Sequence, residues 1–349
     1  MGIMARRAHD GDREGRTLGV LIAIHATAVV IGLSLVPPST GVAEGVVLLG
    51  QADDPRQQRQ PRVELAPGER LAVIGGPGAG KTSTLAMISS QLPDAVIVPT
   101  DPEQAWDAVE ELAGGRHGAV LCDDLDVLVG QYASDYAQLF LSRWESIARA
   151  PSGTVVTLSR VSGPLGRLLD VFPRRALLRL TSKVEHIAAG GEPAAFDRNR
   201  PAGRAWLDDR ETQLYLPDAE RRAEPAPSDS ALWKPRRQIV GIITPAVDAT
   251  RAALASARTT HRIVTLEEPV EAEQGGGGVI VIGDPEQWRA QWTRLQTVRT
   301  GGEVVVAAEC AGELRQLAGV RELPPYAHQH QDRAWSVEAG SRPRRVLLA

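Results

Sequence analysis

The sequence feature that most constrains this chain is a glycine-rich motif at residues 75–82, Gly-Gly-Pro-Gly-Ala-Gly-Lys-Thr. An apolar run at residues 70–74 precedes it, and a stretch with helical periodicity follows at residues 83–90. Gly-x-x-x-x-Gly-Lys-[Ser/Thr] between a strand and a helix is the P-loop pattern. Its glycines let backbone N–H groups surround phosphate oxygens at the positive end of a helix. The motif therefore predicts nucleotide binding.

Residue types within the motif have distinct expected roles. Lys81 can neutralise the β and γ phosphates, and the Thr82 hydroxyl can ligate Mg²⁺. The alternative is a glycine turn with an incidental lysine. Only three of the 39 basic residues are lysines, which disfavours that alternative. The expected nucleotide-binding residues are Gly75, Gly76, Pro77, Gly78, Ala79, Gly80, Lys81, Thr82 and Ser83.

A second pattern, an apolar strand that ends in acids, lies about forty residues further on. Residues 119–122 precede Asp123 and Asp124, as in a Walker B segment. Asp123 would hold Mg²⁺ through water, and Asp124 stands where many ATPases carry a glutamate that orients the attacking water. The shorter aspartate leaves the hydrolysis rate open. The alternative for Asp124 and Asp126 is a helix-capping or loop acid, and we expect Cys122 to be a buried strand residue without chemistry.

Further strands and helices are expected to complete an α/β domain. Apolar runs predict strands at 95–98, 153–160 and 176–180, a hairpin over 204–216, and helices at 102–113 and 133–150. Polar residues at the end of the strand at 153–160 could sense the γ phosphate, or they could be ordinary turn residues. These candidates are Thr157, Ser159 and Arg160.

Composition and missing motifs exclude several protein classes. The balance of 39 basic and 43 acidic residues argues against a polybasic nucleic-acid binder. Residues 94–145 are strongly acidic whereas residues 160–210 are basic, so a polyanion or an acidic subunit could still dock on the basic half. Two cysteines cannot form a disulfide framework and indicate a reducing compartment. The absence of Leu-Ser-Gly-Gly-Gln and of Asn-Lys-x-Asp argues against an ABC transporter ATPase and a small GTPase.

Residues 177–216 resemble the end of the motor domains in FtsK/SpoIIIE-type ATPases, particularly the actinobacterial and type VII secretion ATPases. Those domains close with a leucine-rich strand, a polar helix, a Pro-Gly-Arg segment and a final strand containing glutamine. Residues 201–205 and Gln213 match, with one inserted residue. Ser159 and Arg160 are similar in position to a Gln-Arg-Pro sensor segment, although this chain has neither the glutamine nor the proline.

The resemblance implies a RecA-like ATPase that uses ATP and Mg²⁺ to move DNA or a secreted protein. Such motors work as homo-oligomeric rings or as tandem motor domains, with an arginine supplied by a neighbouring subunit or domain. On this interpretation Lys81 and Asp124 are catalytic, and Thr82 and Asp123 hold the metal. The main alternative is a regulatory or docking module that binds nucleotide with little or no hydrolysis.

The chain is expected to begin with a segment and linker at residues 1–61, followed by the P-loop domain at 62–216 and a second linker at 217–236. Residues 18–36 carry no formal charge and could be a membrane helix, buried strands or a signal peptide. Residues 45–49 favour a buried parallel strand, and residues 51–61 a polar linker. We expect a cytoplasmic protein, with membrane association if residues 18–36 span a bilayer.

Residues 237–349 are expected to form a second α/β domain, with strands at 238–243, 262–266, 279–284 and 303–307. It is either a degenerate RecA-like repeat or an unrelated accessory domain. Thr244 stands where a phosphate loop would begin, and Asp284 imitates half of a Walker B site. The overall fold class is therefore α/β, with a RecA-like P-loop NTPase domain on a parallel sheet followed by a degenerate domain.

Three other features of this domain favour structural roles. Gly275–Gly278 is expected to be a loop rather than a phosphate cradle. Trp288 and Trp292 lie four apart, as in a docking stripe, but we expect them to pack on the sheet. His328 and His330 have no Cys or acid partners at metal-ligand spacing.

Overall fold

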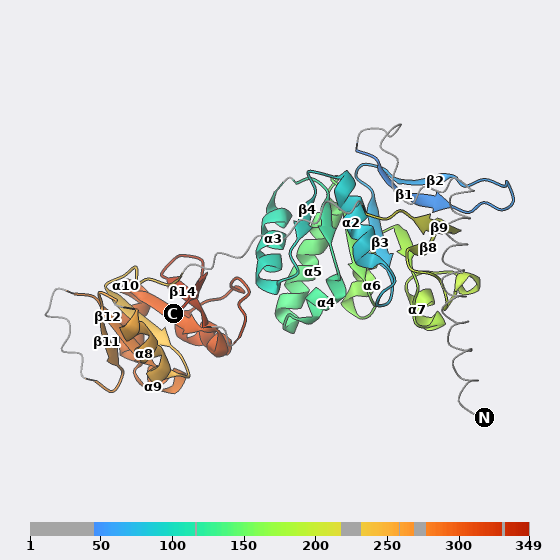
Figure 1. Cartoon of the computed structure of the whole chain (residues 1–349). Helices are drawn as coiled ribbons and strands as arrows, with labels where there is room; N and C mark the ends of the chain where they lie inside the picture. The colour runs from blue at the N-terminus through green and yellow to red at the C-terminus, as the bar shows by residue number, and fades with distance from the viewer. Residues whose placement is uncertain are drawn as a thin grey trace, which may run out of the picture. The chain divides into compact units, whose positions relative to one another are not determined.

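The structure is a computed structural model that describes residues 45–115, 117–217, 232–257, 259–268, 277–329 and 332–348. The chain divides into two compact units, each built on its own sheet (Figure 1). The first comprises the described residues of Met1–Val98, Gly115–Gly130 and Leu141–Ala223. The second comprises those of Pro99–Gly114, Gln131–Phe140 and Glu224–Ala349. The expected α/β fold class is confirmed.

The first sheet has nine described strands in the order β2-β1-β9-β8-β7-β3-β6-β5-β4. Strands β7, β3, β6, β5 and β4 run parallel. Residues of β3, β5 and β6 are almost all buried, as strands covered on both faces of a parallel sheet require. The strands are β1 (Val47–Ala52), β2 (Arg62–Leu65), β3 (Arg70–Ile74), β4 (Val96–Val98), β5 (Val120–Cys122), β6 (Thr154–Leu158), β7 (Arg174–Leu177), β8 (Arg204–Leu207) and β9 (Arg210–Leu214).

Helices connect these strands, and α2, α3 and α5 lie at the positions expected from the sequence, whereas α4 and α6 were not predicted. Helix α2 follows β3 directly (Figure 1). Helix α5 belongs to both units, because the division falls between residues 140 and 141. The α-helices described between residues 45 and 188 are α2 (Lys81–Gln91), α3 (Pro102–Gly114), α4 (Leu125–Gly130), α5 (Ser134–Arg149), α6 (Pro164–Leu168) and α7 (Lys183–Ala188).

The interpretation of residues 51–61 as a polar linker is wrong, and so is the parallel direction expected for residues 45–49. Strand β1 includes Gln51 and Ala52 and pairs antiparallel with β2 and β9. Asp54 and Arg59 form a bridge in the turn between β1 and β2. A Cβ atom on Gly50 would lie 2.1 Å from the Gln213 carbonyl oxygen, so this close approach of β1 to β9 requires glycine.

The second unit has a sheet of six described strands in the order β11-β12-β10-β13-β14-β15. The four strands expected from the sequence run parallel. Two further antiparallel strands, β14 and β15, were not predicted. The elements are β10 (Ile239–Ile243), α8 (Val247–Ser256), β11 (Arg262–Thr265), β12 (Val279–Gly283), α9 (Pro285–Ala290), α10 (Trp292–Gly301), β13 (Glu303–Ala307), β14 (Arg333–Glu338) and β15 (Arg344–Leu347).

The two sheets share one strand order. Read from the antiparallel edge, β15-β14-β13-β10-β12-β11 corresponds to β9-β8-β7-β3-β6-β5, in both order and direction. The second sheet has one parallel strand fewer in the described residues. This correspondence favours a degenerate RecA-like repeat over an unrelated accessory domain.

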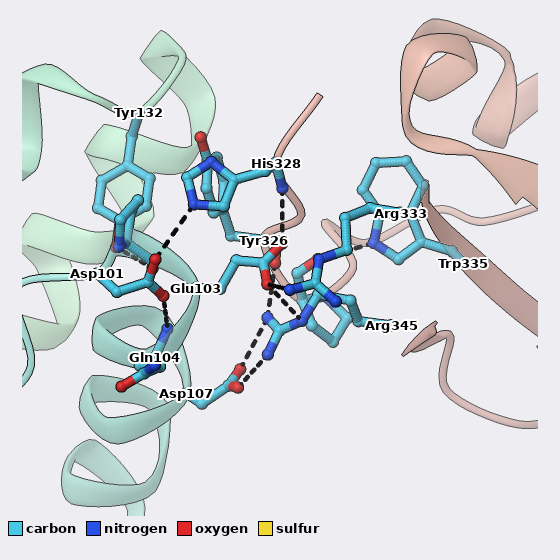
Figure 2. A network of polar contacts seen from close by, with 12 residues as sticks. Asp101, Glu103, Gln104, Asp107, Tyr132, Tyr326, His328, Arg333, Trp335 and Arg345 are labelled. Atoms are coloured by element: carbon cyan, nitrogen blue, oxygen red, sulfur yellow. Dashed lines mark hydrogen bonds and ion pairs between the residues drawn. The ribbon is translucent and has the colours of Figure 1, made fainter. Parts of the chain in front are cut away.

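Helix α3 packs with the second unit, although the sequence placed it inside a continuous P-loop domain at residues 62–216. Figure 2 shows the polar network that holds it. The carboxylate of Glu103 is 1% exposed and lies 2.9 Å from Arg333 Nη2 and 3.5 Å from Arg345 Nε. It also accepts the backbone N–H of His328 at 2.8 Å. A carboxylate buried among two guanidinium groups fixes α3 to β14 and β15.

Residues 18–36 lie outside the described residues, so the membrane helix, buried strands and signal peptide predicted for them remain predictions. Most of the linker at 217–236, part of Gly275–Gly278, and His330 lie outside them as well. None of the helices in the described part of the chain combines the length and the apolarity that crossing a bilayer needs.

Candidate functional site

The P-loop connects β3 to α2, as the motif predicted, and it is held at both sides by neighbouring strands. The Gly75 N–H donates to the Leu158 carbonyl at 3.0 Å, and the Gly76 N–H donates to the Arg179 carbonyl at 2.8 Å. Gly78 and Gly80 have φ values of 66° and 106°, which side chains other than glycine rarely adopt. Helix α2 begins at Lys81, so Lys81, Thr82 and Ser83 form its first turn, where the N–H groups have no partner within the helix.

Lys81 and Asp124 face each other at this loop. The Lys81 side chain is 8% exposed, and its Nζ atom lies 3.3 Å from Asp124 Oδ1. Asp124 has φ of 43°, in the left-handed region that few residues other than glycine occupy. The ammonium group of Lys81 and the carboxylate of Asp124 therefore lie together beside the phosphate loop. Ser159 Oγ also lies 3.4 Å from Asp124 Oδ1.

Thr82 and Asp123 meet directly. The Thr82 hydroxyl donates to Asp123 Oδ2 at 2.7 Å, although the two residues are 41 positions apart in the chain. A hydroxyl and a carboxylate are oxygen ligands of the kind that Mg²⁺ prefers, and Mg²⁺ in nucleotide sites usually has only one or two protein ligands. No cluster of three His, Cys, Asp or Glu residues that could enclose a metal occurs in the described residues. This pair therefore fits Mg²⁺ shared with phosphates, rather than a closed protein cage.

Asp126 has the structural role that was the alternative for it. Its carboxylate accepts the backbone N–H of Ser159 at 2.9 Å and that of Arg160 at 3.2 Å. Thr157 is fully buried and also contacts Asp123. The candidates at the end of β6 therefore serve different purposes, and Thr157 does not face solvent.

Gly203, Gln213 and Arg179 contact the P-loop or brace a residue that contacts it, and none of them was predicted as a site residue. The Gly203 N–H donates to the Ala79 carbonyl at 3.0 Å, and the Gln213 side chain donates to the Gly203 carbonyl at 3.3 Å. The Arg179 guanidinium lies 3.5 Å from the Gly78 carbonyl. Gly203 and Gln213 are among the residues that carried the family resemblance, so this segment was visible in the sequence, but its contact with the P-loop was not. Arg179 had no sequence signal beyond its place after a strand.

The second sheet does not repeat this chemistry. At the end of β10, the Thr244 hydroxyl accepts the Ala246 N–H at 3.2 Å. The carboxylate of Asp284 accepts the N–H groups of Glu286 and Gln287, both at 2.8 Å, and caps α9. The resemblance of Asp284 to half of a Walker B acid is therefore misleading, because its carboxylate binds its own helix.

The remaining candidates have structural positions. Trp288 is fully buried and donates to the Ile242 carbonyl at 2.9 Å, whereas Trp292 is 46% exposed, so only the first packs as expected. His328 Nε2 lies 3.3 Å from Asp101 Oδ2. Burial, followed by the charges of the neighbouring acids, raises the pKa of the Cys122 thiol far above its ordinary value. That agrees with a cysteine that has no chemical role.

A parallel sheet whose central strand leads through a P-loop into a helix is the RecA-like P-loop fold. Comparisons of the sequence with protein-family models and with curated proteins find no match. Solved structures do match. The cytoplasmic domain of the Thermomonospora curvata type VII secretion ATPase EccC is 12% identical, with a TM-score of 0.52, over 90% of this chain and 62% of that one.

A second EccC structure from Thermomonospora curvata contains ATPases 2 and 3 in complex with a signal sequence peptide. It is 13% identical, with a TM-score of 0.50, over 90% of this chain and 96% of that one. At such identities the likeness shows the fold. The chain has the fold of FtsK/SpoIIIE-like ATPase domains of type VII secretion, which confirms the resemblance drawn from residues 177–216.

Proposed function

We propose that this chain binds MgATP at its P-loop and hydrolyses it as a component of an FtsK/SpoIIIE-like motor. The observation that carries the proposal is the convergence of Lys81, Thr82 and Asp123 at the start of α2. The Thr82 hydroxyl and the Asp123 carboxylate lie 2.7 Å apart beside a buried lysine. Two groups from the start of α2 and one from the end of β5 thus meet where nucleotide phosphates bind in this fold.

Each residue has a part in this reaction. Thr82 and Asp123 would hold Mg²⁺, which would offset phosphate charge. Lys81 would contact the β and γ phosphates, and it would then exchange its present partner Asp124 for phosphate oxygens. The freed Asp124 carboxylate would orient the attacking water and accept its proton. A neighbouring subunit or domain would supply an arginine to the transferred phosphoryl group.

Among cargoes, a secreted protein is better supported than DNA. One EccC structure with this fold holds a signal sequence peptide. The sequence has no overall basic excess, which would favour contacts with DNA phosphates. We infer a cytoplasmic component of a secretion system that works as a homo-oligomer or with other motor domains of the same system.

One observation favours a second function, a nucleotide-binding regulator with little hydrolysis. Asp124 is one methylene shorter than the usual glutamate, and in this structure it is paired with Lys81 rather than free. A carboxylate that stays on Lys81 could not orient water. Such a chain would bind nucleotide and change shape, with the second unit as a docking platform.

Thermal unfolding and steady-state hydrolysis of the full chain decide between these functions. Wild-type protein should gain about 2.7 kcal/mol of stability at MgATP concentrations of 100 times Kd, and Lys81→Ala should lose both this gain and turnover. Lys234→Ala removes an exposed lysine of the second unit and should behave as wild type. Stabilisation without turnover identifies the regulator. If MgATP fails to stabilise wild type, or if Lys81→Ala equals wild type, both functions are wrong.

A further inference from the structure

Two threonines interrupt the otherwise apolar strand β6, Thr-Val-Val-Thr-Leu, and both side chains are buried. Strand β6 lies between β3, which leads into the P-loop, and β5, which leads into the two acids. A hydroxyl in such a strand must find a partner or lose hydrogen bonds that water would provide. The two threonines differ in this respect, and the difference identifies a role for one of them.

The Thr157 hydroxyl binds both residues of the acid pair. It donates to Asp123 Oδ1 at 2.5 Å and accepts the backbone N–H of Asp124 at 2.7 Å. A hydroxyl has one proton to donate, and that proton is used on Asp123. Because Thr157 is 0% exposed as well, it is not arranged to contact a phosphate itself. Its action on the site must pass through the two acids.

The bond to the Asp124 N–H lies where the backbone is unusual. Asp124 has φ of 43°, and residues in this region persist only when surrounding contacts hold them. The Thr157 hydroxyl supplies such a contact, and the resulting backbone turn points the Asp124 carboxylate toward Lys81. On the other acid, Thr157 takes Oδ1 of Asp123, which leaves Oδ2 for Thr82.

A side chain that follows β5 also binds backbone N–H groups that follow β6. The Asp126 carboxylate, beyond the end of β5, accepts the N–H groups of Ser159 and Arg160 beyond the end of β6. Side chains from each strand end therefore hold the backbone of the other. This reciprocal arrangement holds the two acids in place through contacts from both strand ends.

We propose that Thr157 is the positioning residue for both acids of the nucleotide site. It orients Asp123 for Mg²⁺ and holds Asp124 in the conformation needed to orient water. The proposal rests on the proposed ATPase function for its catalytic part, but its structural part can be measured without catalysis.

Three variants of β6 test it. Thr157→Val keeps the shape and removes the hydroxyl, and Thr157→Ser keeps the hydroxyl. Thr154→Val is the matched control, because the Thr154 hydroxyl is buried on the same strand without a hydrogen-bond partner among the described residues. The measurements are kcat and KM for ATP, the Mg²⁺ concentration at half-maximal rate, and hydrogen exchange at the Asp124 amide.

Thr157→Val should lower kcat by roughly 10- to 100-fold and raise the Mg²⁺ requirement, as loss of a residue that orients a metal ligand does. KM for ATP should change little, since the P-loop is intact. The Asp124 amide should exchange faster. Thr157→Ser should restore most of each quantity, and Thr154→Val should match wild type.

If Thr157→Val and Thr154→Val lower kcat equally, the loss comes from altered packing of β6 and not from the Thr157 hydroxyl. This result would overturn the proposal. Wild-type Mg²⁺ dependence and amide exchange in Thr157→Val would do the same. If wild type does not hydrolyse ATP, the proposed function fails. Asp124 amide exchange and the Mg²⁺ dependence of nucleotide-induced stabilisation then still decide whether Thr157 positions the acids.

Discussion

The two sheets of this protein have the same strand order, but the loops that follow their central strands differ. The same strand order therefore occurs with and without a phosphate-binding loop. The central strand β3 leads through Gly75–Gly80 into α2, whereas β10 leads through Thr244, Pro245 and Ala246 into α8. Three residues are too few to surround a phosphate, and none of them is a glycine. Strand topology therefore permits a nucleotide site, and the loop decides whether there is one.

The acids after the flanking strands show the same contrast. Asp123 follows β5 and binds side chains from two other segments, Thr82 and Thr157. Asp284 follows β12 and binds the backbone of the helix it begins. An acid at the end of a strand can thus assemble a site or cap a helix, and only its partners distinguish the two roles.

The largest effect we expect comes from comparing these two acids by mutation. Asp123→Ala should lower ATP turnover by roughly two orders of magnitude or more, because it removes the partner of Thr82 and a proposed metal ligand. Asp284→Ala should leave turnover unchanged and cost about 1 kcal/mol of stability through loss of the N-cap. Steady-state ATPase assays and urea unfolding measure both quantities. Similar losses of turnover in the two variants would show that Asp123 and Asp284 do not differ in role.

The second effect concerns the network that fixes α3 to the second unit (Figure 2). Glu103→Gln should cost about 3–5 kcal/mol, because it leaves the buried guanidinium of Arg333 without its carboxylate. Arg333 contacts Glu103 through Nη2, and its Nε and Nη1 atoms have no hydrogen-bond partner among the described residues. Urea unfolding measures the loss, and hydrogen exchange should rise in peptides from α3 and β14.

The matched control for this network is Glu110→Gln on the same helix. Glu110 is partly exposed and lies 3.6 Å from Arg342, whose side chain is 83% exposed. A pair so open to solvent contributes about 0–1 kcal/mol. Equal destabilisation by the two substitutions would show that burial of Glu103 is not what holds α3.

The smallest effect is a pH dependence in the first unit. His186 is fully buried, and its Nε2 hydrogen-bonds the Glu192 carbonyl at 3.0 Å. Burial lowers the pKa of His186 below its ordinary value of 6.5. The unfolded chain therefore binds a proton that the folded chain resists, so stability is full above pH 6.5 and is lost as pH falls through the folded pKa.

This contribution should reach at most about 1.4 kcal/mol per pH unit. Urea unfolding of wild type and His186→Gln between pH 5 and pH 8 measures it. The variant should be less stable at pH 7.5 and should show a shallower slope below pH 6.5. An identical slope in both proteins would assign the pH dependence to other groups.

Much of the parallel framework followed from local patterns. The apolar runs that became β3, β5, β6 and β10 are short, continuous and bounded by turns, which is typical of buried parallel strands. The edges of both sheets were harder. Strand β1 extends to Gln51 and Ala52, within the segment expected to be a polar linker, because it pairs with β9, which is more than 150 residues away. Strands β14 and β15 alternate weakly and depend on β13 for their pairing.

Some residues of the candidate site were also predictable from local pattern, whereas others depend on distant contacts. The P-loop residues were identifiable because their spacing alone specifies a strand, a glycine loop and a helix start. Thr82 and Asp123 were both expected to hold Mg²⁺, but neither their direct hydrogen bond nor the contacts of Thr157 with the two acids were predicted, since a threonine in a strand has no distinctive pattern. Asp284 imitates a Walker B acid in the sequence because a capping acid and a Walker B acid occupy the same position after a strand.

The sequence by itself determined that a phosphate loop follows the central strand and that two parallel α/β frameworks lie along the chain, because glycine spacing and apolar periodicity act over a few residues. The tertiary structure alone decided which acid meets Thr82, which threonine holds the acids, and that α3 belongs with the second unit. Those contacts join residues 34 to 230 positions apart. Their partners are selected by packing and burial, which no local pattern records.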